Sequence, residues 1–131
     1  MGRINWREAL KWDDEQLEDL RVVGFAYIRQ GKYDIALPIF EALCVLDTES
    51  AYDAQTLGAL YMQTGNPNKA LKCFDKALKL DADHTPTLLN LAKTFFMLGR
   101  KHEGLKLANI LKEEPNQQIS NTAKALILAY S

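Results

Sequence analysis

The sequence predicts an all-α fold, a right-handed superhelical solenoid in which three helix–turn–helix repeats stack within one domain, residues 1–131. Three observations predict this architecture. Residues of the same type recur at a spacing of 34 along most of the chain, which is typical of repeats built from helix pairs. Glycines keep that spacing at the expected turns. The composition, with 47% hydrophobic and 25% charged residues, is that of a soluble globular protein.

Charge and hydropathy exclude several classes of protein. The formal net charge of −1 gives no basic field to hold a phosphate backbone, which argues against nucleic acid as the main partner. No uninterrupted apolar run approaches the roughly 18 residues that a membrane span requires. The first residues, 1–6, contain no apolar stretch of signal-peptide length. We therefore expect a cytoplasmic protein that does not insert into membranes.

The residues capable of site chemistry are scattered. Cys44 and Cys73 lie within helical patterns without metal-ligand spacing, and buried free thiols fit a reducing cytosol; a disulfide or a reactive thiol is the alternative. His84 and His102 are isolated, and we expect each on the surface or in a loop. No motif brings an acid, a base and a nucleophile together. We expect no enzyme activity, no cofactor and no metal.

The elements follow in order from the N-terminus. Residues 4–12 predict a short separate helix that carries the large apolar residues Trp6, Leu10 and Trp12. Asp13 and Gln16 have the spacing of a capping box, in which each side chain pairs with a backbone N–H at a helix start. This pair predicts that a second helix begins directly afterwards.

The first two repeats cover 17–50 and 51–84 and align without a gap. They share nine identical residues in 34 aligned positions, where chance would give about two on ordinary amino-acid usage. Two sets of residues recur at this spacing in all three repeats: Gly31, Gly65 and Gly99, and Tyr27, Tyr61 and Phe95. Five pairs recur in the first two repeats: Gly24 and Gly58, Ala36 and Ala70, Phe40 and Phe74, Leu46 and Leu80, and Asp47 and Asp81.

This pattern resembles the signature of the tetratricopeptide repeat (TPR) family over residues 17–118. Each residue type has a physical reason. Gly24 and Gly58 are expected where two helices approach too closely for a side chain. The glycines that follow the first helices are expected where the backbone is left-handed. The recurring alanines keep the second helix close to the first, and the recurring phenylalanines fill the space between neighbouring repeats.

The third repeat, 85–118, departs from the pattern. Gly104 stands in place of the packing alanine, and Ala108 stands where phenylalanine is expected. Pro86 falls in the first turn of the first helix, where proline is tolerated. Terminal repeats are often atypical, so we count this one. Residues 119–131 predict one more helix that caps the stack, with an apolar stripe made by Ile119, Ala123, Leu126, Ile127 and Tyr130.

In TPR stacks the first helix of each repeat lines a concave groove, and the resemblance implies which residues face it here. Repeat one contributes Arg21, Val22, Phe25, Ile28 and Arg29. Repeat two contributes Tyr52, Gln55, Thr56, Ala59, Met62 and Gln63. Repeat three contributes Leu89, Asn90, Lys93, Phe96 and Met97. These side chains are largely apolar or uncharged, which favours an extended or helical apolar peptide as ligand. The alternative is that several pack against the N-terminal helix or a second copy.

Four of these residues are the main candidates for partner contact: Phe25, Tyr52, Met62 and Phe96. Some TPR proteins instead clamp a C-terminal carboxylate with lysine, arginine and asparagine at set groove positions. In this chain those positions hold Arg21, Phe25, Pro86 and Asn90. The clamp is largely missing, so we do not expect a heat-shock-protein tail as the ligand.

Charge is distributed unevenly along the chain. Residues 1–50 carry six basic and ten acidic side chains, whereas residues 51–112 carry nine basic and five acidic ones. Lysines line one face of the second helix of repeat two, at Lys69, Lys72, Lys76 and Lys79. One interpretation is a solvated convex face. The other is that the two ends steer a partner or a second copy head to tail.

One segment resembles a narrower family. Residues 40–47, Phe-Glu-Ala-Leu-Cys-Val-Leu-Asp, are similar to a motif of the class II chaperones of bacterial type III secretion systems. Gly24, Gly31, Tyr33 and Ala36 fit that family as well. The resemblance implies a bacterial cytosolic chaperone that holds a translocator-type export substrate in its concave groove, with a possible homodimer or co-chaperone. The alternatives are a chaperone of the needle subunit that acts with a small co-chaperone, and a generic TPR scaffold in a multiprotein complex.

Overall fold

The computed structural model describes residues 4–131, and this part of the chain contains eight α-helices and no strand. Their bounds are α1 Trp6–Leu10, α2 Asp14–Arg29, α3 Tyr33–Leu46, α4 Ala51–Gln63, α5 Pro67–Leu80, α6 Thr85–Met97, α7 Lys101–Leu111 and α8 Gln117–Tyr130. Residues 1–3, which begin the segment considered above for a signal peptide, lie outside the described residues. The prediction of an all-helical TPR solenoid is confirmed.

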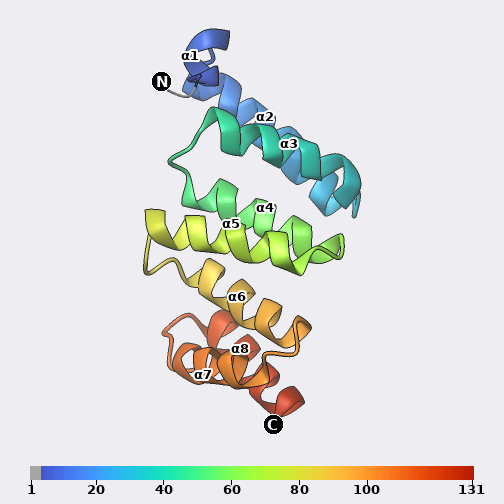
Figure 1. Cartoon of the computed structure of the whole chain (residues 1–131), viewed down its shortest axis with the longest axis vertical. Helices are drawn as coiled ribbons and strands as arrows, with labels where there is room; N and C mark the ends of the chain where they lie inside the picture. Colours follow the sequence, from blue (N-terminus) through green and yellow to red (C-terminus); the bar gives the residue numbers. More distant parts are fainter. Residues whose placement is uncertain (1–3) are drawn as a thin grey trace.

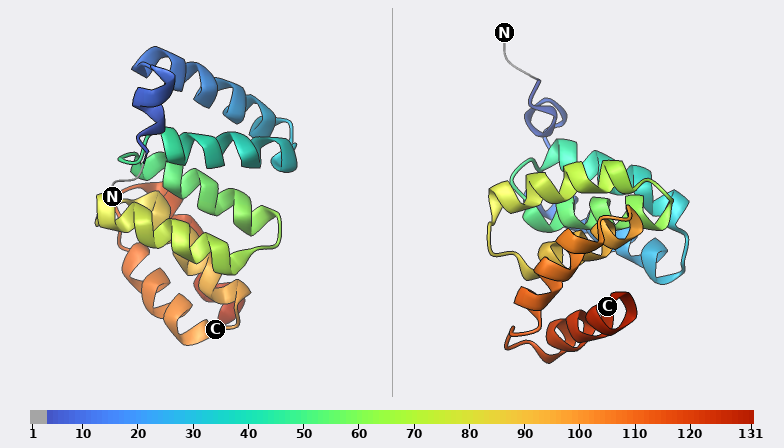
Figure 2. Two further views of the ribbon diagram at one scale, coloured as in Figure 1. Left: turned by 45° about the horizontal axis from the view of Figure 1, so that its top comes forward. Right: turned by 60° about the horizontal axis from the view of Figure 1, so that its bottom comes forward.

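The helices pair and stack along the molecule, as Figure 1 shows. Helices α2 and α3, α4 and α5, and α6 and α7 form three successive helix pairs, and α8 packs against α7 and α6 at the C-terminal end. Helix α1 rests on α3 at the opposite end of the stack (Figure 2). Within residues 4–131, no helix is long and apolar enough to cross a membrane.

The N-terminal helix is shorter than the 4–12 expected from the sequence. The Asn5 side chain accepts a hydrogen bond from the backbone N–H of Glu8 and caps the start. Lys11 ends the helix because its backbone is left-handed, with φ of 56°. The capping box expected at the next helix is confirmed: the backbone N–H of Asp13 donates to Gln16 Oε1 at 2.9 Å, and that of Gln16 donates to Asp13 Oδ1 at 2.9 Å.

The turns within the repeats use glycine as expected. Gly31, Gly65 and Gly99 have φ values of 73°, 82° and 75°, a region that residues with a side chain rarely enter. Each follows the first helix of its repeat by two residues and reverses the chain into the second helix. The position of all three therefore follows from backbone geometry alone.

Within the first two helix pairs, a glycine on the first helix faces a phenylalanine on the second. A Cβ added to Gly24 would lie 2.6 Å from Phe40 Cε2, and one added to Gly58 would lie 2.4 Å from Phe74 Cε1. Both rings are fully buried. The close approach predicted at these glycines is thus an approach to the ring of the same repeat.

The third helix pair reverses this arrangement. Here the ring is that of Phe96 on the first helix, and the glycine is Gly104 on the second, where an added Cβ would lie 2.7 Å from Phe96 Cε1. Ala92 and Ala108, at the positions of the glycine and the phenylalanine in the earlier repeats, are fully buried. The departures in this repeat compensate one another, because each large residue still meets a small one.

Candidate functional site

A pocket of about 320 Å³ opens between the first helices of repeats one and two. Helix α2 contributes Phe25 and Ile28, α3 contributes Tyr33, and α4 contributes the remaining wall, which consists of Gln55, Thr56, Ala59, Leu60 and Gln63. The structure therefore brings together six of the groove residues expected from the sequence. Their role in binding a partner stays a prediction.

Phe25 is the largest apolar side chain in this pocket. Its ring makes an edge contact with Phe40, with centroids 5.2 Å apart, and it remains 39% exposed. Phe40 is fully buried, so it fixes one side of the Phe25 ring and leaves the other open. Tyr33 was not among the expected groove residues because it begins a second helix. Its position directly after the turn at Gly31 brings it to the mouth of the groove.

Arg21 was expected to face a partner, but the structure engages it within the chain. Its Nε donates to Asp53 Oδ1 at 2.9 Å, and its Nη2 donates to Asp53 Oδ2 and to Asp47 Oδ2, both at 2.7 Å. Asp53 is 1% exposed. Hydrogen bonding to Asp53 raises the pKa of Arg21 above its usual value, and burial opposes that shift. We call Arg21, Asp47 and Asp53 the arginine clasp, because it joins repeat one to repeat two.

His84 lies in a loop, as the sequence allowed, but it is not a surface residue. It is 6% exposed and lies at the N-terminal cap of α6. Its Nδ1 lies 2.6 Å from Thr87 Oγ1, and its Nε2 has no hydrogen-bond partner within residues 4–131. The Tyr52 ring stands edge-on to the imidazole, with centroids 4.4 Å apart. The Tyr52 ring comes from α4, the first helix of repeat two, and packs against His84 at the end of the same repeat.

Tyr52 is 62% exposed and keeps its place among the groove candidates. Phe96 does not, because it is only 7% exposed, packs on Gly104 and stacks on Tyr130 with centroids 4.1 Å apart. The sequence repeat placed it at a groove position, but the reversed packing of repeat three draws it into the core. Thr56 is also buried, whereas Met97 is exposed and Met62 is half-buried.

The other predicted groove residues are spread along the stack. Val22 and Arg29 are exposed on α2, and Leu89, Asn90 and Lys93 are half-buried on α6. Leu89 packs against the small core cluster of Ala92, Leu111 and Ala123. None of these five lines the pocket between α2 and α4. The pocket is therefore confined to the first two repeats.

The titratable groups give little support for site chemistry. Cys44 and Cys73 are free and half-buried. Burial raises the pKa of the Cys44 thiol to about 12 and that of the Cys73 thiol to about 11, so neither supplies appreciable thiolate near neutral pH. In the part of the chain that the structure describes, no cluster of histidine, cysteine and carboxylate side chains could hold a metal ion. What the site offers is apolar surface and uncharged polar groups.

Comparison with solved structures finds TPR proteins that cover most of the chain. The Yersinia enterocolitica type III secretion chaperone SycD, in complex with a peptide of the translocator YopD, has a TM-score of 0.80 at 22% identity over 90% of this chain and 94% of that chain. PcrH from Pseudomonas aeruginosa has a TM-score of 0.79 at 26% identity over 91% and 94%. The first TPR of Spaghetti (RPAP3), bound to an HSP90 peptide, has a TM-score of 0.76 at 22% identity over 89% and 94%.

Comparison with curated protein sequences finds no match. The sequence model of the family described as anaphase-promoting complex, cyclosome, subunit 3 matches residues 29–111, which is more than half of the chain. That segment runs from the end of α2 to the end of α7 and so includes the helix pairs α4–α5 and α6–α7 in full. The chain therefore belongs to this TPR-type family, anaphase-promoting complex, cyclosome, subunit 3.

Proposed function

We propose that the chain is a cytosolic chaperone of a bacterial type III secretion system, which holds a segment of a translocator-type export substrate in its concave groove. The observation that carries this proposal is the pocket between α2 and α4, where apolar side chains remain open to solvent. Structural relatives support it, because SycD has been solved with a peptide of the translocator YopD and PcrH with the chaperone binding regions of PopD and PopB.

The chemistry of the groove suits a short apolar segment. Phe25 and Tyr52 present aromatic surface, and burying one large apolar side chain contributes about 1.5–3 kcal/mol. Gln55 and Gln63 line the same pocket, and their side-chain amides make no hydrogen bond to other residues within 4–131. These amides can pair with the backbone of a bound peptide, so that its polar groups are not buried without partners.

The arginine clasp argues against recognition of a C-terminal carboxylate. Arg21 is the one basic residue among the positions at which other TPR proteins clamp such a group. This chain already supplies its carboxylate partners, which are Glu18, Asp47 and Asp53. A peptide carboxylate would have to displace Asp53 from a bidentate contact. Similarity to the RPAP3 repeat therefore concerns the fold, and the ligand expected here is apolar.

The test is binding of the full chain to a peptide that spans the chaperone-binding region of a translocator from the same cell. Phe25→Ala combined with Ala59→Glu should weaken binding at least tenfold, because the first change removes apolar contact and the second places a charge in the pocket. Ile110→Ala, at an exposed apolar position on α7, is the matched control and should bind normally. Unchanged affinity of the double variant, with its helical spectrum intact, would place the site elsewhere.

A further inference from the structure

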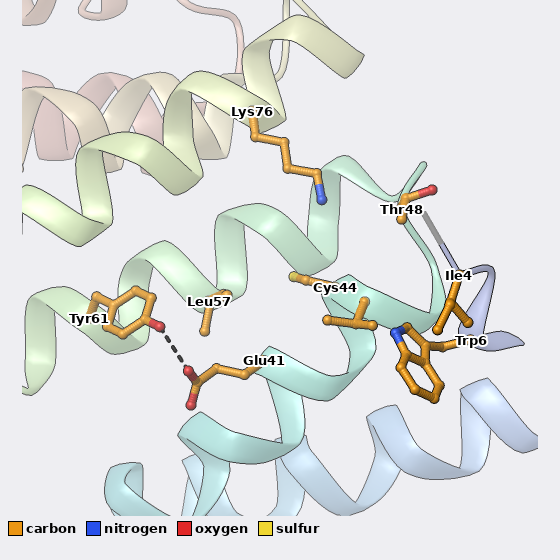
Figure 3. A pocket seen from close by; sticks show the side chains of 9 residues that line it. Ile4, Trp6, Glu41, Cys44, Thr48, Leu57, Tyr61 and Lys76 are labelled. Carbon is orange, nitrogen blue, oxygen red and sulfur yellow. Dashed lines mark hydrogen bonds between the residues drawn. The ribbon is translucent and has the colours of Figure 1, made fainter. Parts of the chain in front are cut away.

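A second and larger pocket, of about 740 Å³, lies away from the concave groove. It is bounded by α3 and α5, which are second helices of their repeats, by α4, and by the N-terminal segment (Figure 3). The groove pocket is lined by α2, α4 and the start of α3, and the two pockets share no lining residue. A molecule bound in one leaves the other open.

The floor and one wall of this convex pocket are apolar. Cys44 and Leu57 form the floor, Val45 also lines the pocket, and Ile4 and Trp6 reach in from the N-terminal segment. Val45 is 52% exposed and Trp6 is 46% exposed. Large apolar side chains gathered around one pocket are unfavourable in water, and such clusters mark sites of interaction with other proteins.

The charged side chains at the two ends of the pocket differ in whether they already have a partner within the chain. At one end the Tyr61 hydroxyl donates to Glu41 Oε2 at 3.0 Å, so the one carboxylate that lines the pocket already has a partner. At the other end the Lys76 ammonium points toward the pocket near Thr48 (Figure 3). Lys76 forms no ion pair with any residue in the range 4–131, and the Thr48 hydroxyl forms no hydrogen bond there.

The lysines along α5 also differ in whether their ammonium groups contact another side chain. Lys79 pairs with Asp75 at 2.9 Å, and the Lys69 ammonium lies 5.5 Å from the centre of the Tyr61 ring. Lys76 has neither kind of contact, and it is half-buried at the rim of apolar surface. A cation placed there strengthens binding of a partner carboxylate, because the surrounding side chains partly exclude water.

We propose that the convex pocket docks a segment of a second protein in which a large apolar side chain stands next to an aspartate or glutamate. The apolar side chain occupies the floor over Cys44 and Leu57, between Trp6 and α5. The carboxylate pairs with Lys76 at the end of the pocket that Thr48 also lines. Because the groove stays free, this second protein binds whether or not a substrate segment occupies the concave face.

The experiment is site-specific photocrosslinking of the full chain in cells that naturally produce it. Thr48 is replaced by p-benzoylphenylalanine, and the matched control carries the same replacement at Asn68, an exposed position in the first turn of α5. We expect an adduct from position 48 and none from position 68. Mass spectrometry of the adduct should place the link in a segment that contains a large apolar residue beside an acidic one.

Two further variants test the chemistry. Lys76→Glu should reduce the yield of the adduct at least tenfold, and Lys76→Arg should preserve it, since the guanidinium keeps the positive charge and also pairs with a carboxylate. Phe25→Ala should leave the adduct unchanged, which separates this site from the proposed substrate groove. A synthetic peptide of the crosslinked segment should bind the purified chain, and replacing its acidic residue by the amide should weaken binding at least tenfold.

Several results would overturn the proposal. These are the absence of an adduct from position 48, a link to another copy of this chain, a crosslinked segment without an acidic residue, or a yield that Lys76→Glu does not change while the helical spectrum is intact. Loss of the adduct on Phe25→Ala would show that the partner occupies the groove instead. Binding of the translocator peptide in the groove is measured separately by the earlier experiment, so either proposal can fail while the other stands.

Discussion

Removing the buried carboxylate of the arginine clasp should destabilise the first repeat. In Asp53→Ala, Arg21 loses a bidentate contact with Nε–Oδ1 and Nη2–Oδ2 distances of 2.9 and 2.7 Å and keeps Asp47. Breaking a buried ion pair by removing one partner costs about 3–5 kcal/mol. Because Asp47 remains, we expect about 3 kcal/mol, a large fraction of the stability of a domain of this size.

The assay is urea-induced unfolding followed by circular dichroism, with Arg21→Leu, Asp53→Ala and the combination Arg21→Leu/Asp53→Ala compared. Replacing both partners by apolar residues leaves no buried charge unpaired, so the double variant should be closer to wild type than either single variant. Glu103→Ala is the control, because the Arg100–Glu103 pair is exposed and its loss should have no measurable effect.

Amide hydrogen exchange measures which helices lose stability in the Asp53→Ala variant. Repeats stabilise one another mainly through nearest-neighbour contacts, so Asp53→Ala should lower amide protection in α2 and α3 more than in α6, α7 and α8. If each single change cost less than about 1 kcal/mol and the two effects added, the clasp would not join the repeats and the reasoning would be wrong.

Two further predictions concern packing and the thiols. Gly58→Ala should lower the melting temperature, because its Cβ would lie 2.4 Å from the Phe74 ring, and overpacking of this kind costs about 1–3 kcal/mol. Adding Phe74→Leu to the same chain should restore part of the lost stability. An unchanged melting temperature in Gly58→Ala would contradict the helix register. Burial raises the pKa of Cys44 and Cys73 from 9.0 to about 12 and about 11, so at pH 8 the folded protein should react with iodoacetamide roughly 100-fold or more slowly than the protein in urea. Since these thiols ionise first in the unfolded chain, stability should fall as pH rises from about 9 toward 12, and equal alkylation rates in the two states would refute their burial.

The repeat register was predictable because it depends on local backbone geometry. Glycines at a spacing of 34 indicated the turns, and the close approach of two helices at Gly58 was expected from the same spacing. The contact of Gly58 with the Phe74 ring of its own repeat was not expected, because the phenylalanines were assigned to the space between repeats. The likeness to secretion chaperones seen in residues 40–47 was confirmed by the structural neighbours. These features need only a few residues in phase, which one sequence can show.

The features that depend on which side chains meet in the folded stack were not predictable. Arg21 lies 26 and 32 residues from its partners Asp47 and Asp53, and nothing in the periodicity marks those pairs. His84 was expected on the surface or in a loop, and its burial was missed because it depends on contact with Tyr52, 32 residues earlier on α4. Phe96 was assigned to the groove by its position in the repeat. The repeat pattern does not show that in the third repeat the buried ring comes from the first helix of the pair.

The reversed packing of the third repeat limits how such chains can recombine. If α6 were paired with α5, the rings of Phe96 and Phe74 would both fall in the space between the two helices. Ala92 would also place a Cβ at the position where Gly58 has none. If α4 were joined to α7, Gly58 would face Ala108 and leave a void. The unit that can be exchanged in this stack is therefore the helix pair. Exchange of single helices between repeats two and three would destabilise the fold, because it would overpack one helix pair and leave a cavity in the other.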